Sequence, residues 1–114
     1  MHDCIFCKIG KGEVPSDTVF ETNGVRVFKD IHPKAPTHFL VIPKTHIGSI
    51  AELDDNDQHV LVEMIYTAKR VAESLQLKGY KLVFNVGREG GQVVDHLHLH
   101  VLGGWREGKD QDII

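Results

Sequence analysis

The first third of the chain alternates apolar and polar residues with the two-residue period of strands. β-Branched and aromatic residues at 18–21 and 25–28 flank Asn23-Gly24, a turn pair that favours a hairpin. The run "THFLVIP", residues 37–43, predicts a third strand that its proline ends. Three short strands are therefore expected before residue 44.

From Asp54 onward the apolar period lengthens to three and four residues, which predicts one long helix. Its apolar stripe consists of Leu61, Met64, Ile65, Ala68, Val71, Ala72 and Leu75. Asp54 or Asp55 can cap its start, and Gly79 suits the position after its last turn.

Two more strands follow, "YKLVFNVG" (80–87) and "HLHLHVLGG" (96–104), separated by the loop "GREGGQVVD". Five strands with hairpin turns and one long helix predict an α+β fold with an antiparallel sheet. No repeat or linker interrupts the pattern, so a single domain is expected over 1–114, with a core at about 4–104 and a C-terminal tail at 105–114.

Composition narrows the possible partners. The chain has 114 residues, 41% of them hydrophobic, which suffices for a core. The net charge is −3 and the basic residues are spread along the chain, so no duplex nucleic acid partner is expected. No apolar run is long enough for a membrane span. The N-terminus lacks a signal-peptide pattern, so a cytoplasmic location is expected.

The stretch "DHLHLH" carries the clearest chemical signal. On a strand, His96, His98 and His100 share one face, while Leu97 and Leu99 face the core. Neutral imidazoles attack phosphorus and move protons, and clustering disfavours the protonation of each. A solvated strand face, or a patch that binds metal adventitiously, is the alternative interpretation.

The two cysteines, Cys4 and Cys7, form a C-x-x-C pair. In a reducing compartment this spacing indicates half of a metal site or a redox pair. A tetrahedral zinc site needs two further ligands, for which the sequence has several histidines. Both interpretations stay open at this point.

"PTHFLVIPKTHI" and "NVGREGGQVVDHLHLHVLGG" together resemble the histidine triad (HIT) superfamily, whose motif is His-x-His-x-His. The span 3–104 is similar to its Hint branch of nucleotide-binding proteins. The resemblance implies a five-stranded antiparallel sheet, a long helix and a short N-terminal helix. It also implies a homodimer whose sheets join into one of ten strands. The implied activity is hydrolysis of purine nucleoside 5′-phosphoramidates to an amine and a nucleotide such as AMP or GMP, without an organic cofactor.

The same resemblance implies catalytic roles. His98 would be the nucleophile that forms a nucleotidyl-imidazole intermediate, with the carbonyl of His96 holding its Nδ1–H. His100 would contact the phosphate and assist proton transfer, and His38 would belong to the same network. The phosphate would also meet side chains and backbone amides of the glycine loop, namely Asn85, Gly91, Gln92 and Val93. Several relatives have a serine at the position of Val93.

For the nucleoside, the resemblance implies an apolar slot and an acidic ribose ligand. The slot residues are Ile5, Phe6, Ile9 and Ile31, and the ribose ligand is Asp30. Core packing is the alternative for the apolar residues, and Asp30 could equally be a turn residue. The pair Gly90-Gly91 could bind an anion or simply permit a turn.

HIT relatives with cysteines at these positions bind zinc, which implies Cys4, Cys7, His46 and His96 as ligands here. Such a site would be structural, because protein atoms fill all four positions. A redox or free-thiol pair remains the alternative.

Other functions remain possible: dinucleoside polyphosphate hydrolysis, a nucleotide-sensing adaptor, or a zinc metallohydrolase. Asp95 could raise the pKa of a nearby imidazole or face solvent. His2, His32 and His59 are expected at the surface. The tail from Trp105 onward would influence substrate choice.

Overall fold

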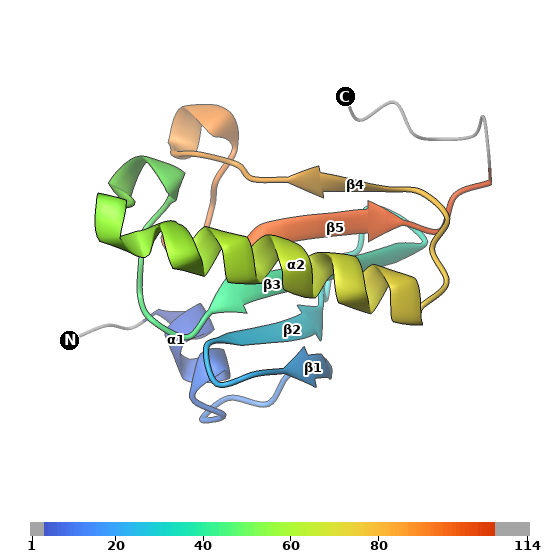
Figure 1. The fold of residues 1–114 in the computed structure, drawn as a ribbon, viewed down its shortest axis with the longest axis horizontal. Helices are drawn as coiled ribbons and strands as arrows, with labels where there is room; N and C mark the ends of the chain where they lie inside the picture. The colour runs from blue at the N-terminus through green and yellow to red at the C-terminus, as the bar shows by residue number, and fades with distance from the viewer. Residues whose placement is uncertain (1–3, 107–114) are drawn as a thin grey trace.

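The computed structural model describes residues 4–106 and has the predicted α+β architecture, with five strands, one long helix and a short N-terminal helix (Figure 1). The helices and strands are α1 (Ile5–Gly10), β1 (Thr18–Glu21), β2 (Val25–Lys29), β3 (Thr37–Pro43), α2 (Gln58–Ser74), β4 (Tyr80–Val83) and β5 (Leu99–Gly103). Three short 3₁₀ helices lie between them: η1 (Ile50–Glu52), η2 (Asp55–Asp57) and η3 (Arg88–Gly90).

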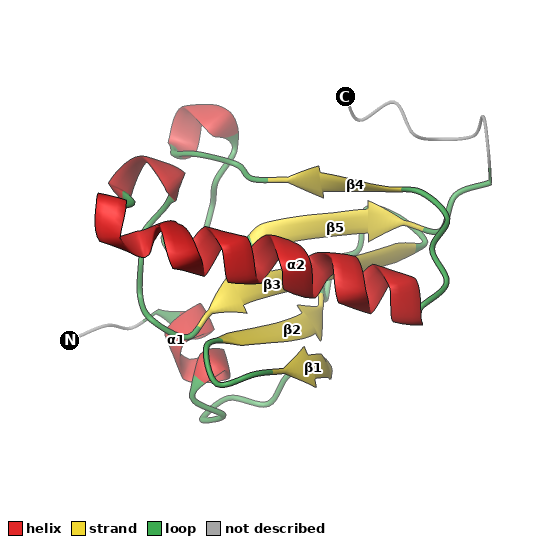
Figure 2. Cartoon of the chain, viewed as in Figure 1, coloured by secondary structure: helices red, strands yellow, loops and turns green. Residues whose placement is uncertain are grey.

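The five strands form one antiparallel sheet in the order β1-β2-β3-β5-β4 (Figure 2). β5 pairs on one side with β3 and on the other with β4. In the β3–β5 register Leu40 lies opposite His100 and Phe39 lies opposite Val101. Opposed residues share a face, so the histidine side chains and the core side chains leave the sheet in opposite directions.

Helix α2 covers one face of the sheet (Figure 1). Its buried Met64, Ala68 and Val71 pack in one cluster with the strand residues Val27, Phe39, Val41, Leu99 and Val101 and with Leu97. The predicted stripe is therefore correct at its centre. Ile65 and Leu75, at its margins, are largely exposed instead, because the face of a single helix that meets a flat sheet is narrower than the sequence stripe.

The predicted cap at Asp54 is confirmed for η2, which runs directly into α2, whereas the predicted end at Gly79 is wrong. The helix begins at Gln58, and the residues before it form η2, where the Asp54 N–H donates to the Asp57 carboxylate at 3.0 Å. The helix ends at Ser74, and Gln76 takes the left-handed conformation with φ of 60° that was expected of Gly79.

The last two strands are shorter than predicted: β4 ends at Val83, and β5 begins at Leu99 rather than His96. Extending the β3–β5 register would place residue 97 opposite Pro43, which has no N–H to donate. The Leu97 N–H bonds instead to the Ile47 carbonyl at 2.6 Å. His96 and His98 therefore lie outside the sheet ladder, just before β5.

The opposite face of the sheet carries α1. Phe6 and Ile9 of this helix form a second cluster with Phe28, Leu40 and Ile42. The rings of Phe6 and Phe28 meet edge to face, with centroids 5.6 Å apart. Within residues 4–106 no helix is long and apolar enough to cross a membrane.

Candidate functional site

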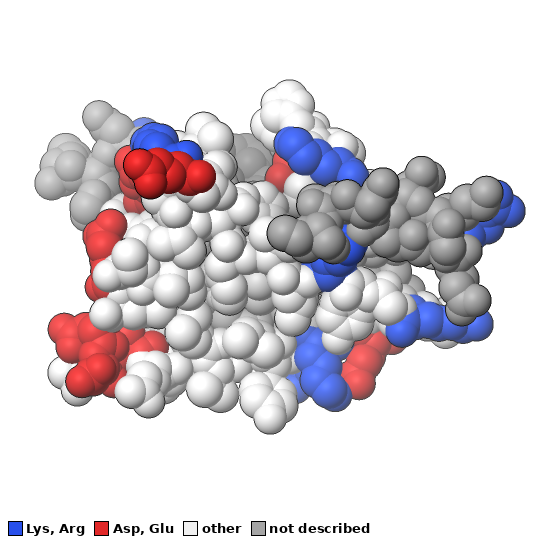
Figure 3. All heavy atoms as spheres, turned by 90° about the horizontal axis from the view of Figure 1, so that it is seen from above, with Lys and Arg blue, Asp and Glu red and all other residues white. Residues whose placement is uncertain are grey.

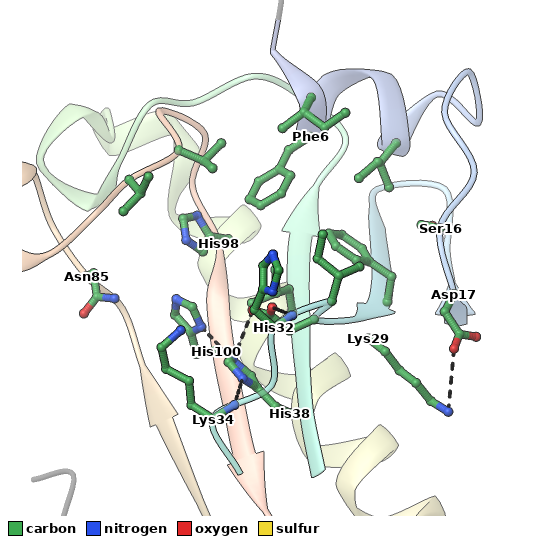
Figure 4. Close-up of a pocket in the computed structure, with 18 of the residues that line it drawn as sticks. Phe6, Ser16, Asp17, Lys29, His32, Lys34, His38, Asn85, His98 and His100 are labelled. Atoms are coloured by element: carbon green, nitrogen blue, oxygen red, sulfur yellow. Dashed lines mark hydrogen bonds and ion pairs between the residues drawn. The ribbon is translucent and has the colours of Figure 1, made fainter. Parts of the chain in front are cut away.

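A cavity of about 690 Å³ lies on the sheet face opposite α2 (Figure 4). One part of its wall is apolar and includes Ile5, Phe6, Ile9, Phe28 and Leu40. The other part is polar and includes Asp30, Lys34, His38, Asn85, His98 and His100. The cavity therefore brings together an apolar slot and a row of imidazoles, which come from α1, the sheet and the loops beside it.

The buried ring of His98 has a fixed tautomer. Its Nδ1 lies 2.7 Å from the carbonyl oxygen of His96, and a carbonyl can only accept, so Nδ1 carries the proton. The lone pair is consequently on Nε2. Burial lowers the pKa of His98 from its ordinary 6.5, although the bond to the His96 carbonyl acts in the opposite direction. A neutral ring with a bare nitrogen can act as a nucleophile at neutral pH.

His38 and His100 form a second ordered pair, so the structure places His38 beside the triad. The Lys34 N–H donates to His38 Nδ1 at 3.1 Å, so the proton of His38 is on Nε2. That Nε2–H donates to His100 Nδ1 at 3.0 Å and leaves His100 with its own proton on Nε2. Burial, followed by the proximity of His98 and His38, lowers the pKa of His100 to about 4.

Asp30 lies beside this pair. Its Oδ2 is 3.5 Å from His38 Nε2, and its Oδ1 accepts the His32 N–H at 2.8 Å. It thus forms the turn that was one expectation and also lines the cavity. Burial lowers the pKa of His38, with the negative charge of Asp30 acting in the opposite direction.

The glycine loop differs from the expectation in one residue. Asn85, Gly91 and Val93 line the cavity, but Gln92 does not. Its buried side chain donates to the Gly48 carbonyl at 2.7 Å and the Val94 carbonyl at 2.9 Å, and accepts the Gly87 N–H at 2.9 Å.

The backbone amides of this loop are also engaged. The Gly91 N–H donates to the Arg88 carbonyl at 3.0 Å, and the Gln92 N–H donates to the Gly87 carbonyl at 2.9 Å. These two amides were expected to bind phosphate oxygens; the loop itself satisfies them here, and their contact with phosphate remains a prediction.

The structure also shows the surroundings of several residues whose positions were predicted from the sequence. Asp95 forms a two-point ion pair with Arg88, at 2.8 and 3.0 Å, rather than facing an imidazole. His32 and His59 are exposed as expected, although His32 also lines the cavity. His2 and the tail beyond residue 106 lie outside the described residues. Lys34 was not recognised from the sequence, because nothing in its local pattern distinguishes it from a surface lysine.

A second cluster consists of Cys4, Cys7, His46 and His96, whose possible ligand atoms all lie within 4.8 Å of one another. His96 Nε2 lies 2.8 Å from the Pro43 carbonyl, so its proton is there and Nδ1 is bare. That Nδ1 lies 3.3 Å from Cys4 Sγ and 3.4 Å from Cys7 Sγ. His46 Nδ1 is 3.1 Å from Cys7 Sγ. Two sulfurs and two imidazole nitrogens form a donor set that fits zinc.

The ionisation of Cys7 bears on this fit. Burial, together with the neighbouring Cys4, raises the pKa of the Cys7 thiol above its ordinary 9.0. A thiolate is the form that binds metal, so a cation among these four side chains would offset the cost of ionising Cys7.

Comparisons with known proteins agree with this geometry. A family model described as "Scavenger mRNA decapping enzyme C-term binding" matches residues 3–110. The chain is 41% identical to the purine nucleoside phosphoramidase of Escherichia coli (strain K12), covering 90% of this chain and 88% of that protein. It is 43% identical to protein HitA of Neisseria gonorrhoeae, covering 90% and 97%.

Solved structures agree as well. A HIT family hydrolase from Legionella pneumophila is 48% identical, with a TM-score of 0.87 over 91% of this chain and 95% of that one. A zinc-bound histidine triad family protein from Mycobacterium smegmatis is 29% identical, with a TM-score of 0.81 over 94% and 78%. Sequence and fold thus both match proteins of one family: the chain belongs to the histidine triad family, and one of the matched proteins is a HIT family hydrolase.

Proposed function

We propose that this protein hydrolyses the P–N bond of purine nucleoside 5′-phosphoramidates, releasing an amine and a nucleoside monophosphate. The observation that carries the proposal is the bond from His98 Nδ1 to the His96 carbonyl, which leaves a bare Nε2 in the cavity. The similarity to the phosphoramidase of E. coli supports this substrate class.

In the proposed reaction, His98 Nε2 forms a bond to phosphorus as the bond to the amine nitrogen breaks. Water then displaces His98 and gives the monophosphate. The His100 Nε2–H protonates the amine nitrogen as it departs, and the proton that the attacking water loses in the second displacement returns to His100. His100 suits this role because its Nε2 carries a proton, which His38 fixes from behind.

The nucleoside would occupy the apolar slot. Phe6 and Ile9 are buried in the second cluster and form its floor, while Ile5 and Ile31 are exposed at its rim. A purine base would cover these two exposed side chains and remove apolar surface from water. The Asp30 carboxylate, at the same cavity, would accept hydrogen bonds from the ribose hydroxyls of AMP or GMP.

Steady-state hydrolysis of adenosine 5′-phosphoramidate tests the proposal. His98→Ala should lose at least about a thousandfold in kcat while still binding AMP, because only the nucleophile is removed. His59→Ala is the matched control, since His59 is exposed on α2 away from the cavity. A His98→Ala enzyme that keeps its rate would contradict the assignment.

Two competing functions give different results in the same assay. A dinucleoside polyphosphate hydrolase would turn over diadenosine polyphosphate faster than the phosphoramidate, using the same His98. A nucleotide-sensing adaptor would bind AMP and turn over neither substrate.

We further propose that Cys4, Cys7, His46 and His96 hold a structural zinc ion. Zinc would supply a cross-link between α1 and the segment before β5, without an open position for water, because four protein atoms already fill its shell. Within the chain, the His96 that faces the sulfurs is also the residue whose carbonyl orients His98. A metallohydrolase is therefore the less favoured alternative.

We also propose that a second copy of the chain pairs along β4, the sheet edge beside β5. Figure 3 looks onto this side of the molecule, whose centre is uncharged with charged side chains around it. Exposed apolar side chains on α2 and β4 support this: Val62, Ile65, Tyr66 and Leu82. An unpaired edge beside an apolar helix face suits a symmetric dimer.

A further inference from the structure

Lys34 places a positive charge at the cavity. Its backbone N–H donates to His38, while its side chain runs alongside His100 on the side facing Asn85 (Figure 4). Among residues 4–106, no carboxylate lies within ion-pair distance of its ammonium group. The other lysine of the cavity wall, Lys29, pairs with Asp17 at 3.7 Å. Lys34 is therefore the lysine of this wall whose charge has no partner in the described chain.

The row of ring contacts places Lys34 relative to the reaction. Phe6 touches His98 with ring centroids 5.1 Å apart, His98 touches His100 at 5.0 Å, and His100 touches His38 at 5.2 Å. Lys34 follows at the end away from Phe6. A base at Phe6 and a phosphoryl group at His98 would direct the remaining part of the substrate toward His100 and Lys34.

That remaining part is the leaving group. In a displacement at phosphorus, the departing atom leaves roughly in line with the attacking one. The proposed proton relay also places the amine nitrogen beside His100. Substituents on the amine would thus extend past His100 into the part of the cavity that the Lys34 ammonium lines.

Resting on the proposed function, we propose that Lys34 determines leaving-group specificity: it selects phosphoramidates whose amine carries an anionic group such as a carboxylate. The neighbouring groups cannot supply this charge. His38 and His100 are occupied by one hydrogen bond to each other, and burial keeps both neutral near pH 7. Lys34 is left as the cation that faces the leaving group.

An alternative role for Lys34 is contact with the reacting phosphoryl group, which every substrate shares. The two roles differ in one measurable way. Contact of Lys34 with the phosphoryl group would change the hydrolysis rates of all substrates equally. The proposed contact with the leaving group changes only the rates of substrates whose amine is charged. Any indirect effect on the His100 pKa would also be common to all substrates, so a ratio of rates isolates the proposed contact.

The test uses three adenosine 5′-phosphoramidates of matched size. Their amines are β-alanine, β-alaninamide and 1,3-diaminopropane, which carry a negative, no and a positive charge. For the wild type, kcat/KM should be about fivefold higher for β-alanine than for β-alaninamide, the size expected of a partly exposed ion pair. Lys34→Met should bring that ratio to about one, and Lys34→Glu should favour the diamine. Both variants keep the backbone N–H that His38 needs.

Lys29→Met is the matched control, because Lys29 lines the same cavity but has Asp17 as a partner. It should keep the wild-type ratio. If Lys34→Met lowers all three rates equally, or changes none, the proposal is overturned while the proposed function stands.

If the wild type hydrolyses none of the three, the proposed function fails, and binding still tests Lys34. ADP carries an anionic group beyond its first phosphate, and AMP does not. Calorimetric titration should show that Lys34→Met weakens the binding of ADP about fivefold and the binding of AMP less than about twofold. Equal weakening of both nucleotides would overturn the contact.

Discussion

At the scale of single residues, main-chain groups fix the imidazole tautomers. The His96 carbonyl holds the Nδ1–H of His98, the Pro43 carbonyl holds the Nε2–H of His96, and the Lys34 N–H meets Nδ1 of His38. A backbone group moves little once the strands have formed, so each ring presents a defined nitrogen before any ligand arrives. The reactivity assigned to His98 thus depends on where its neighbours' peptide groups point.

The low pKa of His100, about 4, predicts how stability depends on pH. The unfolded chain takes up a proton near pH 6.5, and the folded one only near 4, so the free energy of unfolding should fall as the pH falls between these values. Urea denaturation at successive pH values measures this. His100→Gln should show a shallower decline, and an unchanged slope in that variant would contradict the assignment.

Activity should follow the same group. With His100 neutral down to low pH, kcat/KM should stay level near neutrality and fall only below about pH 5, with the limb centred near pH 4. An acidic limb centred at pH 6 or above would show that a different group controls turnover.

The sequence predicted which residues would gather, but not which atoms would be engaged. Alternation along 96–101 separated the histidines from the leucines correctly, because a side chain's face depends only on local backbone geometry. Gln92 was predicted as a phosphate contact and not as a structural residue, and Lys34 was not predicted at all. The hydrogen bonds of a buried amide and the pairing of an ammonium group are set by residues distant in the chain, such as Gly48. The catalytic and binding roles, and the cytoplasmic location, remain predictions.

At the scale of elements, the buried side chain of Gln92 ties the loop between β4 and β5 to the rest of the fold. Gln92 joins Gly87 at the start of the loop to Val94 near its end, and joins both to Gly48. This one buried amide keeps Asn85 and Gly91 at the cavity wall. Element boundaries also show what a local sequence pattern cannot predict. β3 matches the prediction at both ends, whereas β5 starts later than predicted because the residues before Leu99 would have to pair with the end of β3 at Pro43.

Gln92→Met should therefore destabilise the protein by about 2 kcal/mol, because the buried Gly48 carbonyl and two partly buried backbone groups lose their partner without a change of shape. Urea denaturation measures the loss. Lys69→Ala, which removes an exposed ion pair with Glu73 on α2, is the comparison and should change stability far less. Equal effects of the two substitutions would contradict the role given to Gln92.

The proposed zinc site, which would link α1 to the segment before β5, predicts a response to metal removal. The purified protein should contain about one zinc per chain, and a chelator should lower Tm by about 5 °C or more. Cys7→Ser should abolish the difference between chelated and untreated samples. Protein that contains no metal, with both thiols free to react, would favour the redox interpretation of Cys4 and Cys7.

At the scale of the whole molecule, the single sheet has α2 on one face and the cavity on the other. β4 stands last in the strand order and therefore forms one edge of the sheet. The apolar residues Val62 and Tyr66 lie exposed on α2. Light scattering should give a mass about twice the 12.8 kDa of one chain. The double substitution Tyr66→Glu and Val62→Glu should shift the measured mass toward that of a single chain. A monomeric wild type would overturn the proposed pairing.

The strand order has a consequence for biosynthesis. β5 is the last of the five strands to be translated, yet it inserts between β3 and β4 rather than adding to an edge. Until it emerges from the ribosome, β3 lacks one neighbour and β4 lacks its only one, so neither the complete sheet nor the imidazole row exists. The nascent chain must therefore carry an open edge on β3 from its own synthesis until β5 is made, and the cavity is completed in one late, cooperative event.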